Sequence, residues 1–252
     1  MRRHCLVIVS LCLCVFVLNT VPLAADDETI SKAQVTKTEH IDFPPGGVLR
    51  FKNSVGELTV TGWDRPDIEI TTIKSSRAEY GAQERKNAAQ KLDRISVKAE
   101  RHGDEVIITT EFPRYSVFPP PLPWRNEINF DLEYRISVPR NARLVVDHVD
   151  GEVHVDDLTG DIRATVQKGG LTLRLPGDSY TIDAKADIGS VFSDYAGQQR
   201  ARKLHLGTLF TAQPSPAAPT LFLRSGYGDI AITKIRKTPY SLSSRPPSSP
   251  KQ

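Results

Sequence analysis

The sequence predicts an all-β protein, a β-solenoid or β-roll of stacked short strands with one short helical excursion. Apolar and polar residues alternate with a period of two in stretches such as "VLRFKNSVGELTVTGW" from Val48, which is typical of half-buried strands. Nine of the 16 glycines are followed at the second position by Val, Ile or Leu, which indicates a repeated unit of a turn and a short strand. A conventional antiparallel β-sandwich of short strands is the alternative.

The first 25 residues have the order of a secretory signal peptide. Arg2 and Arg3 form a basic start, an almost unbroken apolar run of 14 residues follows from Cys5 to Leu18, and we expect cleavage after Ala25. The run is shorter than the roughly 20 residues of a membrane-spanning helix, so no stable membrane span is expected once the signal is removed. All three cysteines precede Ala25, which leaves the mature chain without disulfides or thiolate metal sites.

The charge of the mature chain is almost balanced. Loss of Arg2 and Arg3 lowers the number of Lys and Arg residues from 33 to 31, against 30 acidic residues. This balance favours neither nucleic acid nor an anionic membrane surface as a partner.

The chain after the signal peptide is interpreted as one domain with flanking segments. Residues 26–45 are expected to be an N-terminal extended segment, and residues 46–237 a single solenoid domain. Within it, residues 78–93 lose the alternation and are rich in Ala, Glu, Lys and Gln, which predicts the helix. Two strands joined by a hairpin turn follow in residues 94–112. Residues 238–252 are rich in Ser and Pro, which predicts a disordered tail.

A proline-rich segment at residues 113–126 interrupts the domain with five prolines. Proline offers no amide donor to a neighbouring strand, so the segment is predicted to be a loop. It is either a stiff connection or an exposed apolar patch that contacts a partner. The candidate contact residues of that patch are Tyr115, Phe118, Leu122 and Trp124.

From Gly151 the glycines that start the repeated unit follow one another at intervals of 9, 9, 20, 18 and 21 residues. These intervals correspond to one or two units of a turn and a short strand. Such a unit cannot bury its apolar face alone, but stacked units can. The alternation predicts these inward-facing residues: Val153, Val155, Ile162, Ala164, Leu171, Leu173, Leu175, Ile182, Ala184, Ile188, Val191, Leu209, Leu221, Leu223, Ile230 and Ile232.

Several motifs in a fixed order resemble those of a known family. They are "NSVGELTVTGWDRPDIEI", then a charged helical segment, "YRISVPRNARLVVDHVDGEVHV", further glycine-acid-aliphatic units, and finally "SGYGDIAI". Together these motifs, which cover about residues 46–235, resemble the bacterial putative-adhesin family, a group of exported β-solenoid domains of unknown function. The resemblance implies a β-solenoid fold and a location in the envelope or at the surface, and it implies no mechanism. The proline-rich segment at residues 113–126 has no counterpart in the family pattern.

Acidic residues are concentrated in "DHVDGEVHVDDLTGDIRA" from Asp147. Their positions between alternating valines predict mainly turns and solvent-exposed side chains. Asp150, Asp157 and Asp161 are the candidates for a cation site, provided that they line up along one edge of the stack. The sequence contains no nucleophile elbow, zinc-protease motif or phosphate-binding loop. No catalytic residue and no cofactor is therefore predicted.

Two functions from different classes are compatible with these features. The first is an exported, non-enzymatic protein of the periplasm, cell surface or medium that acts by surface contact, in an adhesive, structural or ligand-presenting role. Its partner would be an envelope protein or a glycan. The alternative is a carbohydrate-binding or carbohydrate-cleaving β-helix protein. The alternative predicts a groove on one face of the solenoid that is lined by carboxylates and aromatic residues, and the aromatic candidates are Trp63, Tyr180, Phe192, Tyr195 and Tyr227.

Overall fold

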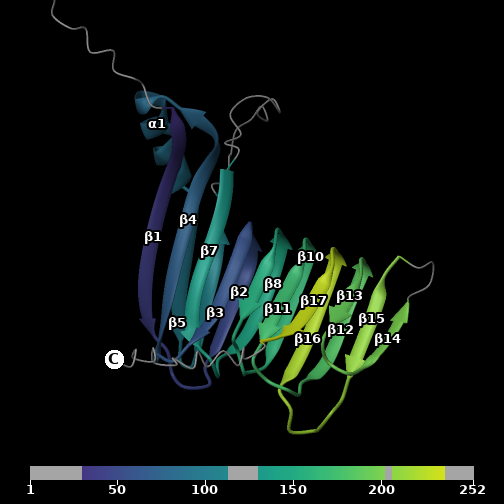
Figure 1. Ribbon diagram of the computed structural model, residues 1–252. Coiled ribbons are helices and arrows are strands. Elements are labelled where there is room, and N and C mark those ends of the chain that lie inside the picture. The colour runs from purple at the N-terminus through teal and green to yellow at the C-terminus, as the bar shows by residue number, and fades with distance from the viewer. Residues whose placement is uncertain (1–29, 113–129, 202–205, 236–252) are drawn as a thin grey trace, which may run out of the picture.

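The computed structural model describes residues 30–112, 130–201 and 206–235, which form β-strands over most of their length (Figure 1). The prediction of an all-β protein is confirmed. The elements are β1 (Ser31–Asp42), β2 (Val48–Val55), β3 (Glu57–Trp63), β4 (Asp67–Tyr80), α1 (Ala82–Asp93), β5 (Ser96–His102), β6 (Glu105–Glu111), β7 (Phe130–Pro139), β8 (Arg143–Asp150), β9 (Val153–Asp156), β10 (Ile162–Lys168), β11 (Leu171–Leu175), β12 (Thr181–Ile188), β13 (Val191–Ser193), β14 (Gln198–Ala201), β15 (Thr208–Ala212), β16 (Thr220–Tyr227) and β17 (Ile230–Lys234).

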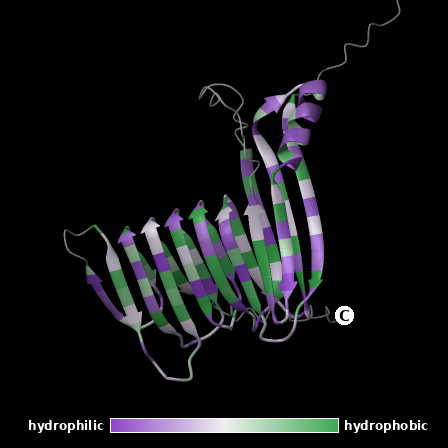
Figure 2. Cartoon of the chain, turned by 180° about the vertical axis from the view of Figure 1, so that it is seen from behind, coloured by the Kyte–Doolittle hydropathy of each residue, from purple (hydrophilic) through white to green (hydrophobic). Residues whose placement is uncertain are grey.

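The strands form two sheets that enclose one core. Sheet A has the order β1-β4-β7-β3-β9-β11-β17-β13, and sheet B has the order β14-β15-β12-β16-β10-β8-β2-β6-β5. Hydrophobic and hydrophilic residues alternate along the strands (Figure 2), and the inward residues of both sheets belong to a single hydrophobic cluster. The alternation in the sequence therefore arises because successive side chains of a strand point to opposite faces, one toward the core and one toward solvent.

The centre of both sheets consists of five units, each with one strand in sheet B followed by one strand in sheet A. The units are β2/β3, β8/β9, β10/β11, β16/β17 and β12/β13, and neighbouring units pair in parallel. If the units were stacked in the order in which they occur in the sequence, β16/β17 would follow β12/β13 at the end of the stack. Instead, β16/β17 lies between β10/β11 and β12/β13. The antiparallel pairing of the sandwich alternative is confined to the outer strands, such as β1 with β4 and β14 with β15.

A glycine corner turns the chain from sheet B to sheet A in each unit. At Gly151 the backbone has φ +122, a conformation that favours glycine. A Cβ at this position would overlap the carbonyl oxygen of Gly56, the corner of the neighbouring unit. The glycines of the repeated sequence are thus required by the close stacking of corners.

The core contains 14 of the 16 residues predicted to face inward. The prediction was wrong for Ile188, which is 43% exposed, because β12 turns into its corner after Ala186. It was also wrong for Leu209, which is half-buried. β15 pairs antiparallel with β12 so that Phe210 lies beside Ala184, and this register turns Phe210 rather than Leu209 into the core.

The helix is shorter than predicted, because residues 78–80 belong to β4, in which Glu79 and Tyr80 pair with β1 beyond a shift of register. α1 starts after Gly81 and buries Ala88 and Leu92 where it packs on β1 and β4. β1 itself comes from the segment 26–45, whose residues 31–42 join the edge of sheet A. In Figure 1, β1, β4 and β7 extend beyond the other strands, and α1 lies beside their upper ends.

Three predicted segments lie outside the described residues. They are the signal peptide (1–25), the proline-rich loop (113–126) with Tyr115, Phe118, Leu122 and Trp124, and the tail (238–252). Within the residues that are described, no helix has the length and apolar character needed to span a membrane.

Candidate functional site

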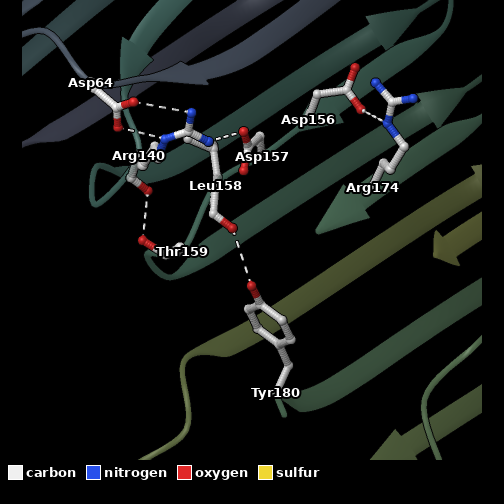
Figure 3. A network of polar contacts seen from close by, with 8 residues as sticks. All are labelled: Asp64, Arg140, Asp156, Asp157, Leu158, Thr159, Arg174 and Tyr180. Atoms are coloured by element: carbon white, nitrogen blue, oxygen red, sulfur yellow. Dashed lines mark hydrogen bonds and ion pairs between the residues drawn. The ribbon is translucent and has the colours of Figure 1, made fainter. Parts of the chain in front are cut away.

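Three turns that are distant in the sequence meet at Arg140 (Figure 3). β7, β3 and β9 are parallel neighbours, so their carboxyl ends lie at the same edge of sheet A. The backbone N–H of Arg140 donates to the carbonyl oxygen of Trp63 at 3.1 Å. The carbonyl oxygen of Arg140 accepts from the N–H of Thr159 at 2.7 Å and from its hydroxyl at 3.0 Å. The backbone thereby joins the turns that follow β3, β7 and β9.

The guanidinium of Arg140 lies between two carboxylates. Nε donates to Oδ1 of Asp64 at 2.7 Å, Nη2 lies 3.4 Å from Oδ2 of the same residue, and Nη1 pairs with Asp157. The hydrogen bond and the positive charge of Arg140 lower the pKa of Asp64, and the same hydrogen bond raises the pKa of Arg140. Both groups therefore stay charged at neutral pH.

Asp157 has a left-handed backbone with φ +58, which Asp adopts more readily than most residues. Its N–H donates to the carbonyl oxygen of Arg174 at 2.9 Å. A Cβ on Gly62 would overlap the carbonyl oxygen of Asp157, so the glycine in "TVTGW" lets β3 approach this turn.

A pocket of about 420 Å³ opens beside this network, and we call it the Trp63 pocket. Its apolar walls are formed by Phe43, Pro45, Trp63, Pro66 and Pro139. Its polar groups are Asp64, Arg65, Arg140, Asn141 and Thr159. Mainly apolar walls with a few convergent polar groups are typical of sites that bind small molecules.

The indole of Trp63 is held in place at the pocket. Its N–H donates to the carbonyl oxygen of Asp67 at 2.9 Å. The guanidinium of Arg65 lies 4.2 Å from the centre of the indole ring and also donates to Asp67 Oδ2 at 2.8 Å. The platform is thus ordered by contacts within the protein.

The outer face of sheet A beside the pocket is polar. A shallow hollow of about 410 Å³ lies there among residues of β3, β9, β11 and β17, including His154, Asp156 and Arg174. Asp156 accepts from Nε of Arg174 at 2.8 Å (Figure 3). Strands far apart in the sequence therefore form one continuous surface.

The structure does not bring the three candidate cation ligands together. Asp157 pairs with Arg140, whereas Asp161 accepts from the N–H of Thr220 at 2.8 Å. Asp150 lies at the opposite end of β9, in a cleft of about 470 Å³ lined also by Gly56 and Asp131. Among residues 30–112, 130–201 and 206–235, no three His, Cys, Asp or Glu side chains are placed to hold a metal ion.

The five aromatic residues predicted to line one groove lie on different surfaces, so that prediction was wrong. Tyr180 and Tyr195 are buried with their rings 5.5 Å apart, and the hydroxyl of Tyr180 donates to the carbonyl oxygen of Leu158. Phe192 is exposed on β13, the last strand of sheet A, and Tyr227 is exposed at the end of β16 in sheet B. Of these five residues, only Trp63 lines the Trp63 pocket. Alternation predicts which face a side chain occupies in one strand, but not which strands become neighbours.

Sequence reasoning missed Arg140 and Asn141. The segment "SVPRNA" predicts a turn, but nothing local distinguishes Arg140 from the other arginines. Its partner Asp64 is 76 residues away, so only the stacking of units reveals the network.

Comparisons with known proteins find similarity among solved structures. The chain resembles a putative cell adhesion protein from Clostridium sporogenes, with 15% identity, a TM-score of 0.47, and coverage of 80% of this chain and 100% of that one. It also resembles a putative adhesin from Bacteroides fragilis, with 11% identity, a TM-score of 0.29, and coverage of 80% and 97%. A third similar structure, a putative lipid binding protein from Parabacteroides distasonis, has 10% identity, a TM-score of 0.22, and coverage of 80% and 97%.

No family model matches the chain, and no curated protein matches it in sequence.

Proposed function

We propose that the chain is an exported, non-enzymatic protein of the cell envelope that acts by surface contact, in an adhesive, structural or ligand-presenting role. Its five stacked units would be a variant of the β-solenoid in which the last unit is inserted between two earlier ones. The signal-peptide pattern of residues 1–25 supports export to the periplasm, the surface or the medium.

The Trp63 pocket is the observation that carries the contact function. Arg140 is shared by two carboxylates, and the pKa directions of Asp64 and Arg140 keep both groups charged. Groups that are ordered and remain charged are suited to hold a partner by hydrogen bonds.

Export is tested by fractionating cells that express the full chain with a C-terminal tag. We expect the tagged protein outside the cytoplasm, with an N-terminus at Asp26 by mass spectrometry. A chain that lacks residues 1–25 is the matched control and should stay in the cytoplasm. Full-length protein retained in the cytoplasm with residues 1–25 attached would contradict the proposal.

The non-enzymatic character is tested by incubating the exported protein with envelope polysaccharides and measuring new reducing ends. We expect none above a heat-denatured control. Sustained release of reducing ends would favour the carbohydrate-cleaving alternative and overturn the proposed function.

A further inference from the structure

We propose that the Trp63 pocket binds one neutral sugar residue of a glycan chain. This inference rests on the contact function proposed above and names the chemistry of the partner. It concerns the pocket formed by the turns after β1, β3, β7 and β9, at the edge of sheet A where these strands end.

The walls of the pocket match one side of a sugar ring. A pyranose has an apolar face of C–H groups and a rim of hydroxyls. Trp63 offers the part of its rigid indole that the guanidinium of Arg65 leaves uncovered, and Phe43, Pro66 and Pro139 extend the apolar lining around it. Stacking of the C–H face on this lining removes apolar surface from water and leaves no buried polar group without a hydrogen bond.

The polar groups of the pocket match the hydroxyl rim. Asp64 retains acceptor capacity beyond its bond to Arg140, since a carboxylate accepts several hydrogen bonds. The side-chain amide of Asn141, which offers both donors and an acceptor, makes no hydrogen bond to the described residues. A hydroxyl can donate to Asp64 and accept from Asn141, so one sugar residue can satisfy both.

The charges favour a neutral partner over an anionic one. Both arginines of the pocket are already occupied, Arg140 by Asp64 and Asp157 and Arg65 by Asp67. An incoming carboxylate or sulfate would have to displace one of these aspartates and would meet the others as like charges. Hydroxyl groups can join the network without breaking an ion pair.

The pocket is organised before binding. The indole N–H of Trp63 is bonded to Asp67, and the backbone of Arg140 is bonded to both Trp63 and Thr159. The indole of Trp63 and the backbone of these turns therefore lose little freedom when a sugar enters, which lowers the entropic cost of binding.

The first experiment applies the exported, full mature chain to an array of neutral and acidic oligosaccharides. We expect binding to neutral members. The strongest neutral oligosaccharide is then titrated into a Trp124→Phe chain, in which Trp63 is the only tryptophan. Saturable change in tryptophan fluorescence would place the sugar at Trp63.

Variants separate the pocket from the rest of the surface. Trp63→Ala and Asn141→Ala should each weaken binding at least about tenfold. Arg135→Ala is the matched control, because Arg135 is an exposed sheet A residue paired with Glu133 away from the pocket, and it should leave binding unchanged. Thermal unfolding of each variant checks that it is folded, and Asn141 is exposed, so its loss should not disturb the fold.

Neutral-glycan binding that is unchanged in both folded variants, or no binding to any neutral glycan at millimolar concentration, would overturn the sugar site. Attachment of the exported chain to whole cells, measured in the same variants, keeps the two proposals apart. Attachment that persists without Trp63 contradicts the sugar site and leaves the contact function standing. An exported chain that attaches to no cell or envelope component contradicts the contact function itself.

Discussion

His148 is a titratable side chain inside the core. It is 1% exposed, its Nδ1 lies 2.8 Å from the hydroxyl of Ser54, and its buried Nε2 has no partner among the described residues. Ser54 points inward because β2 is irregular there, with a left-handed Asn53 and a shift of register against β8. Burial lowers the pKa of His148, while the backbone of Gly56 and Asp150 and the charges of Asp150 and Glu152 oppose the shift.

We expect this histidine to make the protein less stable in mild acid. Because its pKa is lower in the folded chain than the unfolded value of 6.5, the unfolded chain binds the proton first as the pH falls. The free energy of unfolding should therefore decrease below that value and level off below the folded pKa. Urea denaturation between about pH 7.5 and about pH 4.5 measures this slope.

The variant His148→Leu should have a smaller slope over the same pH interval. His102→Asn is the control, because His102 is exposed at the end of β5 and lies outside the core. Equal slopes in both variants would show that the buried imidazole is not the group responsible.

Ser54→Ala leaves Nδ1 of His148 without its partner and should cost about 1–3 kcal/mol of unfolding free energy at neutral pH.

At the scale of elements, each unit depends on a corner that only glycine allows. Gly151 and Gly169 have φ values of +122 and +129, and a Cβ on either residue would overlap the preceding corner's backbone. The repeated glycine of the sequence is therefore a requirement of stacking as well as of the turn.

Substitution of a corner glycine should be far more costly than substitution of a hairpin glycine. Gly151→Ala adds backbone strain and a clash with Gly56, and should lower the free energy of unfolding by at least about 2 kcal/mol. Gly103 has φ +65 in the turn between β5 and β6, but nothing lies near its missing side chain. Gly103→Asn should cost under about 1 kcal/mol. Chemical denaturation measures the free energy of unfolding of both variants. Equal losses for Gly151→Ala and Gly103→Asn would contradict the requirement for glycine at the corners.

The helix is predicted to contribute through its buried face. Leu92 is fully buried and Lys86 is exposed on the same helix. Leu92→Ala should lower the free energy of unfolding by about 2–5 kcal/mol because it leaves a cavity against sheet A. Lys86→Ala should change it by less than about 0.5 kcal/mol. A small effect of Leu92→Ala in denaturation curves would mean that α1 opens independently of the sheets.

At the scale of the whole molecule, the order of units distinguishes this protein from a sequentially wound solenoid. β12 has β16 as its parallel neighbour, and β13 has β17. The unit β16/β17, which is last in the sequence, thus joins β12/β13 to β10/β11. It fills a position inside both sheets and not at their ends.

Truncation after Ala212, which keeps β15 paired with β12 and removes only β16 and β17 among the described strands, tests this coupling. In a sequentially wound stack, removal of the last unit would leave the earlier units intact. Here β12 and β13 should lose their protection in hydrogen exchange, because their parallel neighbours are absent. The matched comparison is truncation after Ile235, which keeps every described strand and should keep them protected. Protected β12 and β13 in the shorter chain would contradict the inserted order.

Much of the fold could be predicted from the sequence because its causes are local. Alternation identified strands and most of the inward residues, and it failed at Ile188 and Leu209, where a corner and an antiparallel register change the face. The helix start was misplaced because residues 78–80 belong to β4, where Glu79 and Tyr80 pair with β1, and that pairing outweighs their local preference for helix. The candidate site was less predictable, since Asp157 was noticed without its partner Arg140.

The sequence by itself determined the all-β class, the repeated glycine unit and the pattern of buried side chains, because each follows from neighbours within a few residues. Only the tertiary structure decided that β16/β17 lies between two earlier units, since similar units can exchange neighbours through backbone hydrogen bonds that carry little sequence information. It also decided that the turns after β3, β7 and β9 meet at Arg140. Parallel stacking creates that pocket by bringing together strand ends whose residues have no proximity along the chain.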